Sequence, residues 1–84
     1  MRSIDDRIRE VLKEHGRLPI EVDSLRDDED LYEDGLTSHA SVNVMLALED
    51  EFDVEFPDAL LRKGTFQSIA AIRSALASLG VDAS

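Results

Sequence analysis

Apolar residues recur at helical spacing in the first segment of the chain, residues 3–15. Four of them follow the i, i+4, i+7, i+8 pattern and share one face: Ile4, Ile8, Val11 and Leu12. Ser3 can cap a helix through its hydroxyl, and Asp5 and Asp6 suit the positive end of a helix dipole. Gly16 supplies a stop signal, so the pattern predicts a helix over residues 3–15.

Residues 17–36 show no comparable period. Pro19 interrupts the segment, and residues 27–30 form the acidic run Asp-Asp-Glu-Asp. We expect a long ordered loop with a helical turn near residues 24–27, and a connection of this length in a small domain is often functional. Six apolar residues are expected to anchor it to the core: Leu18, Ile20, Val22, Leu25, Leu31 and Leu36.

Residues 38–52 are predicted to form a second helix that carries two apolar stripes. The stripe that is wide enough to face the core contains Ser41, Val44, Met45, Leu48 and Phe52. The other stripe contains Ser38, Val42 and Leu46, at i, i+4 and i+8. Because three helices cannot cover every side of this one, the stripe that leads up to Ser38 is expected to stay partly exposed.

Pro57 marks a boundary after the second helix, because the residue before a proline avoids the helical region. Residues 58–63 can form a short helix or a turn that Gly64 closes. A last helix is predicted to begin at Thr65, whose hydroxyl can cap it, and to end at Gly80. No segment alternates as a strand does, so the pattern predicts an all-α fold with helices packed near antiparallel.

The composition limits both the size of the fold and its chemistry. The 84 residues suffice for one small core, so we expect a single domain over residues 1–84 without a deep catalytic cavity. The absence of Cys excludes disulfides, thiolate metal ligands and Cys nucleophiles. No apolar run approaches the roughly 18 residues of a membrane span and no signal peptide is visible, so we expect a cytoplasmic protein. We also expect a monomer.

The net charge of −10, from 19 acidic and 9 basic residues, indicates the kind of partner. Nucleic acid and anionic membranes would be repelled, because both are bound through clustered Lys and Arg. A protein with a basic patch is the partner that this charge would attract. The alternative is that acidity only keeps a small protein in solution.

Within the acidic run, a calcium-binding loop would have to begin at Asp30. Asp34 and Gly35 fit the fifth and sixth positions of an EF-hand loop. Tyr32 and Ser41 occupy the third and twelfth positions, so the bidentate ligand is missing. We expect no dedicated metal site, although loose divalent binding that screens self-repulsion stays open.

Ser38 and His39 are adjacent, but they are poorly arranged as the nucleophile and base of a hydrolase. Neighbouring helical residues project about 100° apart, and His15 could approach Ser38 only through a tertiary contact. The two His are also too few and too far apart for a zinc site. Ser38 can therefore be a helix cap without chemistry, or an exposed serine at a helix N-terminus that favours an attached phosphate.

Four stretches of the chain resemble the acyl carrier protein family over about residues 31–79. They are Gly35-Leu36-Thr37-Ser38-His39-Ala40-Ser41-Val42, Leu46-Ala47-Leu48-Glu49-Asp50-Glu51-Phe52, Phe56-Pro57-Asp58 and Thr65-Phe66. The resemblance implies an all-α, four-helix bundle with a long loop between the first and second helices. It also implies that Ser38, which aligns with the serine of the family's Gly-x-Asp-Ser-Leu motif, carries covalent 4'-phosphopantetheine.

Two residues depart from the family motif: Thr37 replaces the usual Asp, and His39 replaces the usual Leu. With Gly35-Leu36 before them and Phe56-Pro57-Asp58-Ala59-Leu60-Leu61 further on, they make the chain resemble bacterial aminoacyl carrier proteins. The resemblance implies charging by an amino acid:carrier protein ligase that is similar to a truncated seryl-tRNA synthetase. The alternatives are an acyl carrier protein of fatty-acid or polyketide type and an unmodified acidic helical adaptor.

The resemblance further implies how such a carrier works. A phosphopantetheinyl transferase would attach the arm, whose thiol holds an activated amino acid as a thioester for downstream transferases. The carrier itself would not be an enzyme, because its partners supply the chemistry. The implied partner-binding residues are Thr37, His39, Val42, Asn43, Leu46, Glu49 and Asp50. Two alternatives stay open, that Val42 and Leu46 are core residues and that the acidic residues form a solvated face.

Overall fold

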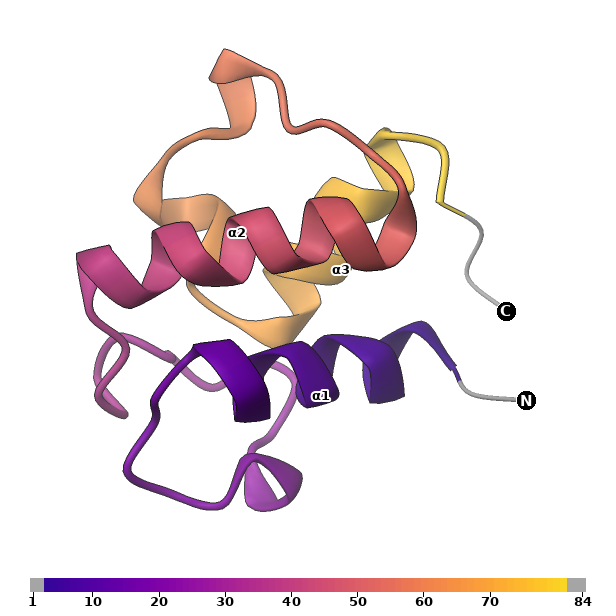
Figure 1. Cartoon of the computed structure of the whole chain (residues 1–84). Coiled ribbons are helices and arrows are strands. Elements are labelled where there is room, and N and C mark those ends of the chain that lie inside the picture. The colour runs from indigo at the N-terminus through magenta and orange to yellow at the C-terminus, as the bar shows by residue number, and fades with distance from the viewer. Residues whose placement is uncertain (1–2, 82–84) are drawn as a thin grey trace.

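The computed structural model describes residues 3–81 and contains three α-helices in this range (Figure 1). They are α1 (Ile4–His15), α2 (Ser38–Phe52) and α3 (Ile69–Ser78). Three short 3-10 helices accompany them: η1 (Val22–Ser24), η2 (Asp58–Leu60) and η3 (Lys63–Phe66). No strand occurs within residues 3–81, which confirms the all-α prediction. The ends of the predicted domain, residues 1–2 and 82–84, lie outside the described residues.

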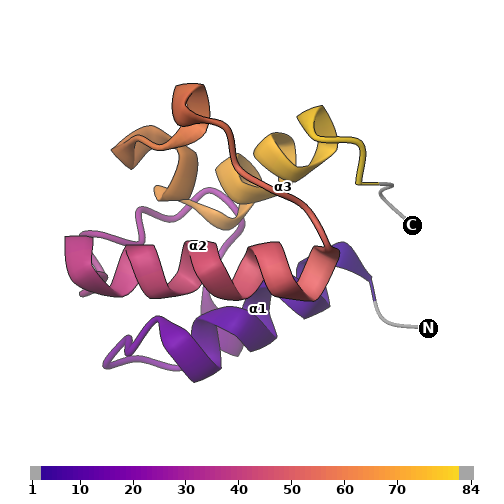
Figure 2. The same cartoon turned by 45° about the horizontal axis from the view of Figure 1, so that its top comes forward.

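The four-helix bundle is not what the structure shows, because the segment between α2 and α3 forms η2 and η3 instead of an α-helix. An α-helix in so short a segment would not recover the cost of its nucleation. Pro57 precedes η2, and Gly64, a poor helix former, lies within η3. The rings of Phe56 and Phe66 pack with centroids 5.5 Å apart and hold this segment to the core. In Figures 1 and 2 the segment arches from the end of α2 back over its first half.

The boundaries of α1 and α2 agree with the predicted helices. The Ser3 Oγ accepts a hydrogen bond from the Asp6 amide at 3.1 Å and caps α1 as predicted. Gly16 is the C-cap residue of α1, but Arg17 is the residue that takes the left-handed conformation, at φ 52°. None of the helices within residues 3–81 is long and apolar enough to cross a bilayer.

The predicted start of the last helix is wrong by several residues. Ser68 caps α3, since its Oγ accepts a hydrogen bond from the Ala71 amide at 3.0 Å. Thr65 lies in η3 and is only 8% exposed, so its hydroxyl is not the cap. Ser is only a slightly stronger N-cap than Thr, so the sequence pattern alone does not choose between two candidates three residues apart.

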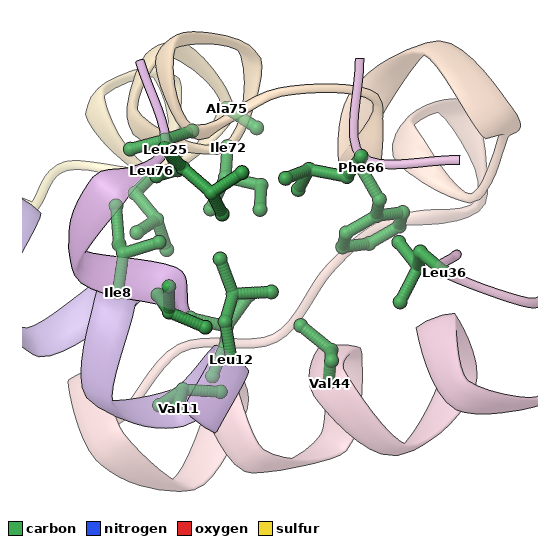
Figure 3. Packing of buried hydrophobic residues seen from close by; sticks show 14 of the residues in the cluster. Ile8, Val11, Leu12, Leu25, Leu36, Val44, Phe66, Ile72, Ala75 and Leu76 are labelled. Atoms are coloured by element: carbon green, nitrogen blue, oxygen red, sulfur yellow. The ribbon is translucent and has the colours of Figure 1, made fainter. Parts of the chain in front are cut away.

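The core lies where α1, α2 and α3 meet the long loop, and Figure 3 shows labelled side chains of these elements turned toward one interior. Of the six predicted loop anchors, four are buried, namely Val22, Leu25, Leu31 and Leu36. Leu18 is partly buried, but Ile20 is 40% exposed, so its prediction as an anchor is wrong. The helical turn expected near residues 24–27 lies slightly earlier, as η1.

Backbone contacts fix the loop and thereby the start of α2. The Arg9 guanidinium donates hydrogen bonds to the carbonyl oxygens of Val22 and Leu25, at 2.7 and 2.9 Å. Gly35 has a φ of 118°, and a Cβ at this position would lie 2.6 Å from the Cδ of Pro19. Glycine is therefore required where the loop passes Pro19 just before α2 begins.

Candidate functional site

The N-terminus of α2 is organised by Thr37 and leaves Ser38 free. The Thr37 Oγ1 accepts a hydrogen bond from the Ala40 amide at 3.0 Å, which makes Thr37 the N-cap. Ser38 is the first helical residue, is exposed, and its hydroxyl has no hydrogen-bond partner within residues 3–81. The hypothesis that Ser38 is merely the cap is therefore wrong, because its neighbour performs that role.

The surroundings of the Ser38 hydroxyl favour an anion. A helix N-terminus has free amide N–H groups and the positive end of the dipole. The first turn of α2 contains no acidic residue that would neutralise it. The Ser41 Oγ donates a hydrogen bond to the Ser38 carbonyl at 2.7 Å, which holds this turn together without using the Ser38 side chain. A phosphate on the Ser38 oxygen would therefore meet favourable partial charges.

A groove of about 350 Å³ lies directly beside Ser38, between α2 and the segment that follows it. Val42 and Met45 form its α2 wall, and Leu61 and Phe66 contribute apolar surface from the opposite side. Its volume falls within the range of about 300–1,000 Å³ that is typical of small-molecule sites. The sequence pattern did not reveal this groove, because its second wall comes from residues about 20 positions further along the chain.

The two stripes of α2 separate as predicted. Val44 and Leu48 are fully buried, whereas Val42 and Leu46 are 51% and 53% exposed, so the possibility that the latter two belong to the core is excluded. Within the buried stripe Ala40 takes the place expected for Ser41, which is half-buried. Met45 and Phe52 of the same stripe are also only partly buried.

The remaining predicted partner residues lie on α2 or at its N-cap and differ in their surroundings. Thr37, His39 and Asp50 are exposed. Asn43 is half-buried and lines, with Asp50, a second groove of about 590 Å³ between α1 and α2. Glu49 has a structural contact, since its Oε2 accepts a hydrogen bond from the Phe56 amide at 2.8 Å. In its predicted role at the rim of a partner surface, the Glu49 carboxylate would have to contact the partner while it keeps this hydrogen bond.

The acidic residues of the long loop take part in hydrogen bonds that hold the loop in place. Asp30 Oδ1 accepts a hydrogen bond from the Tyr32 amide at 2.9 Å, and Oδ2 accepts one from the Gln67 side chain at 3.0 Å. The bond from Gln67 is the main reason why the pKa of Asp30 is lowered. Within residues 3–81 no group of three or more His, Asp or Glu side chains is arranged to hold a metal ion.

The carboxyl group of Asp34 lies beside that of Glu29. No donor reaches the Asp34 Oδ2 within residues 3–81, although this oxygen is buried. Protonated Asp34 can donate a hydrogen bond to Glu29, and this raises the pKa of Asp34 and lowers the pKa of Glu29. The loop before α2 therefore contains one carboxyl group that resists ionisation.

Comparison with known proteins shows the family of the chain. Residues 6–73 match the family described as "Phosphopantetheine attachment site", which covers most of the chain. The aminoacyl carrier protein of Agrobacterium fabrum is 54% identical over 65 residues, which span 77% of this chain and 78% of that protein. The carriers of this family bear covalent 4'-phosphopantetheine.

Solved structures agree with the sequence match. One is an engineered Bradyrhizobium japonicum glycine:[carrier protein] ligase complexed with carrier protein from Agrobacterium tumefaciens and AMP; the match has a TM-score of 0.86 and 47% identity and covers 88% of this chain and 99% of the matched chain. Another is the Bradyrhizobium japonicum ligase complexed with glycylated carrier protein, with a TM-score of 0.72 and 27% identity over 84% of this chain and 95% of the matched chain. The match over residues 6–73 and the similarity to these proteins show that the chain belongs to the phosphopantetheine carrier proteins and is a homologue of the aminoacyl carrier proteins.

Proposed function

We propose that Ser38 is the residue that carries the phosphopantetheine arm. The observation that supports this proposal most strongly lies at the start of α2. There Thr37 caps the helix, and the Ser38 hydroxyl has no hydrogen-bond partner within residues 3–81. Ser41 is the other serine of this turn, but its hydroxyl already donates a hydrogen bond to the Ser38 carbonyl. Ser38 is therefore the free nucleophile of this site.

The attachment reaction would be an in-line transfer of a phosphoryl group from the pyrophosphate of coenzyme A to the serine hydroxyl. The Ser38 oxygen forms a bond to the phosphorus of the pantetheine phosphate of coenzyme A, and the bond from that phosphorus to 3',5'-ADP breaks. The proton of the hydroxyl passes to a base of the phosphopantetheinyl transferase. The carrier contributes the exposed oxygen and the positive end of α2, which stabilises the phosphodiester that results.

The thiol of the arm would hold an activated amino acid as a thioester, and a ligase would load it. The support comes from the relatives, since one of the similar structures contains a glycylated carrier protein, and glycine is the first amino acid to test. The chain has no Cys, so the only reactive sulfur would arrive with the cofactor. The carrier would act as a single domain and a monomer in the cytoplasm, without catalysis of its own.

The partner surface would be the exposed stripe of α2, defined by Ser38, Val42 and Leu46. Val42 and Leu46 are large apolar residues with about half of their surface exposed, which is the kind of patch that partner proteins cover. Asp50, at the far end of the stripe, would meet a basic residue at the rim of the ligase or transferase.

Mass spectrometry after incubation with coenzyme A, magnesium and a broad-specificity phosphopantetheinyl transferase tests the proposal. The wild-type chain is expected to gain the mass of one arm, and Ser38→Ala is expected to gain none. Ser41→Ala is the matched control from the same turn and should be modified as the wild type is. A wild-type chain that stays unmodified while a known carrier is modified would refute the assignment. So would a mass gain that persists in Ser38→Ala.

A further inference from the structure

The cations of this acidic protein fall into two groups. Five of them lie between 2.7 and 3.9 Å from a carboxylate oxygen: Arg7, Arg9, Lys13, Arg26 and Arg73. Within residues 3–81, three others make no such ion pair: Arg17, Arg62 and Lys63. Arg62 and Lys63, the only adjacent basic residues of the chain, both line the groove beside Ser38.

The environment of these two cations suits an anionic ligand. Both are exposed, and no carboxylate residue is among those that line the groove. The Lys63 Nζ lies 4.8 Å from the centroid of the Tyr32 ring. The charge of Lys63 also acts on the Asp30 carboxylate, although the two groups form no ion pair within residues 3–81. The protein has 19 acidic residues, yet these two adjacent cations beside the candidate attachment serine form no ion pair with any of them in the described residues. A phosphate group attached to that serine could form charged hydrogen bonds with both.

The rest of the groove matches the next part of the arm. Ser38 is itself a lining residue, so a group attached to its oxygen begins at the wall of the groove. The pantetheine phosphate is followed by a carbon with two methyl groups, and Val42 and Leu61 offer apolar surface to such a group. The order of groups in the arm, a phosphate and then an apolar carbon, thus matches the groove, which offers cations and apolar side chains.

We propose that Arg62 and Lys63 bind the phosphodiester of the arm on Ser38, and that the groove keeps the charged end of an amino-acid cargo out. This inference rests on the proposed attachment at Ser38. The α-ammonium group of an aminoacyl thioester would lose its hydration in the apolar groove, where no carboxylate could pair with it. Arg62 and Lys63 add repulsion between like charges. The base of the arm is held against the protein, and the loaded amino acid stays in solvent, where partner enzymes reach it.

The test compares two arms of nearly the same shape. Carrier bearing the arm would be loaded with a glycyl or a propionyl group through a stable amide in place of the thioester. The two cargoes differ in an ammonium group against a methyl group. In NMR spectra of both, the geminal methyl protons of the arm are expected to show NOEs to the methyl groups of Val42 and Leu61. The propionyl methyl should also show NOEs to Met45 or Phe66, whereas the glycyl methylene should show none.

Charge substitutions test the role of the cations. In Arg62→Gln/Lys63→Gln the bound fraction of the arm is expected to fall about fivefold, the factor that two exposed charge contacts can supply. Arg17→Gln/Arg26→Gln changes the net charge equally, outside the groove, and should leave the NOEs unchanged. Raising the salt concentration with the wild-type protein should reduce the bound fraction in the same direction, without any substitution.

The outcomes separate the two proposals. If mass spectrometry shows no arm on Ser38, the proposed function fails. If the arm is present and its methyl protons show no NOE to the groove, the inference fails and the attachment stands. Equal losses in the two double variants would show that net charge, and not Arg62 and Lys63, holds the arm. Equal contacts for glycyl and propionyl ends would overturn the exclusion of charged cargo.

Discussion

The two faces of α2 are made of similar residues but lie in opposite environments. Val44 and Leu48 are fully buried among α1, α3 and the loop, whereas Val42 and Leu46 have about half of their surface exposed. Only a rotation about the helix axis separates the two pairs. The buried face stabilises the fold, and the exposed face is apolar surface that the fold does not use. This difference makes the exposed stripe the surface that partners are expected to cover.

The largest expected difference between the two faces is in stability. Leu48→Ala should lower the free energy of unfolding by about 2–5 kcal/mol, because it leaves a cavity in the core. Leu46→Ala removes the same atoms from a half-exposed position and should cost less than about 1 kcal/mol. Urea unfolding of both variants, followed by circular dichroism, measures the two values. Equal losses would show that Leu46 is part of the core and would remove the basis for a partner surface.

The reverse pattern is expected for charging by a ligase. Leu46→Asp should unfold like the wild type but be charged about tenfold more slowly or worse, since it places a charge in an apolar contact. His39→Leu is expected to change the charging rate by a smaller factor, because His39 lies at the same exposed end of α2 as Ser38. Single-turnover charging of the arm with a glycine:[carrier protein] ligase measures both. A Leu46→Asp protein that is charged normally would move the partner surface away from the exposed stripe.

How well the sequence predicts each feature depends on how far apart along the chain its residues lie. The periodicity of Val42, Val44, Leu46 and Leu48 is enough to predict both faces of α2, because the spacing of residues along a helix fixes the side of the helix on which each one lies. The groove beside Ser38 was not foreseen, since Leu61 and Phe66 reach it only after the chain has turned back over α2. Its one sequence signal was the pair Arg62-Lys63, two adjacent bases in a strongly acidic chain.

The N-caps of the helices are also only partly predictable from the sequence. Several Ser and Thr residues lie near the predicted helix starts, and the small difference in capping strength between Ser and Thr is not enough to choose among them. Ser3 was assigned correctly, whereas the last helix begins after Ser68 and not at Thr65. At Ser68 the tertiary contacts decide, since the Ala70 amide donates a hydrogen bond to the Asp27 carbonyl at 2.9 Å and fixes the start of α3 against the loop.

A smaller effect distinguishes the two residues at the start of α2. Thr37→Ala should lower the free energy of unfolding by about 1 kcal/mol, because the Ala40 amide loses its acceptor. Ser38→Ala should leave the stability unchanged within about 0.5 kcal/mol, since the Ser38 hydroxyl has no partner in the described residues. Thermal unfolding of the two variants measures the contrast. A Ser38→Ala protein that loses as much stability as Thr37→Ala would make Ser38 a structural residue.

The smallest effect concerns the carboxyl pair in the loop that leads to α2. Asp34 has a raised pKa, chiefly through its hydrogen bond to Glu29, so its contribution to stability is present while it is protonated and is lost as the pH rises through its folded pKa. Asp34→Asn can make a similar hydrogen bond without ionising. The variant should therefore unfold at a higher temperature than the wild type at pH 7.

The difference should shrink as the pH falls through the raised pKa of Asp34, because the wild-type carboxyl group then regains its proton. The lowered pKa of Glu29 and that of Asp30 act in the opposite direction in acid, where both proteins lose stability as these groups protonate. The difference between the variants, and not either curve alone, therefore reports on Asp34. A gap in unfolding temperature that stays constant from pH 4 to pH 7 would mean that the Asp34 carboxyl is ionised throughout. In that case the loop before Ser38 would contain no protonated pair.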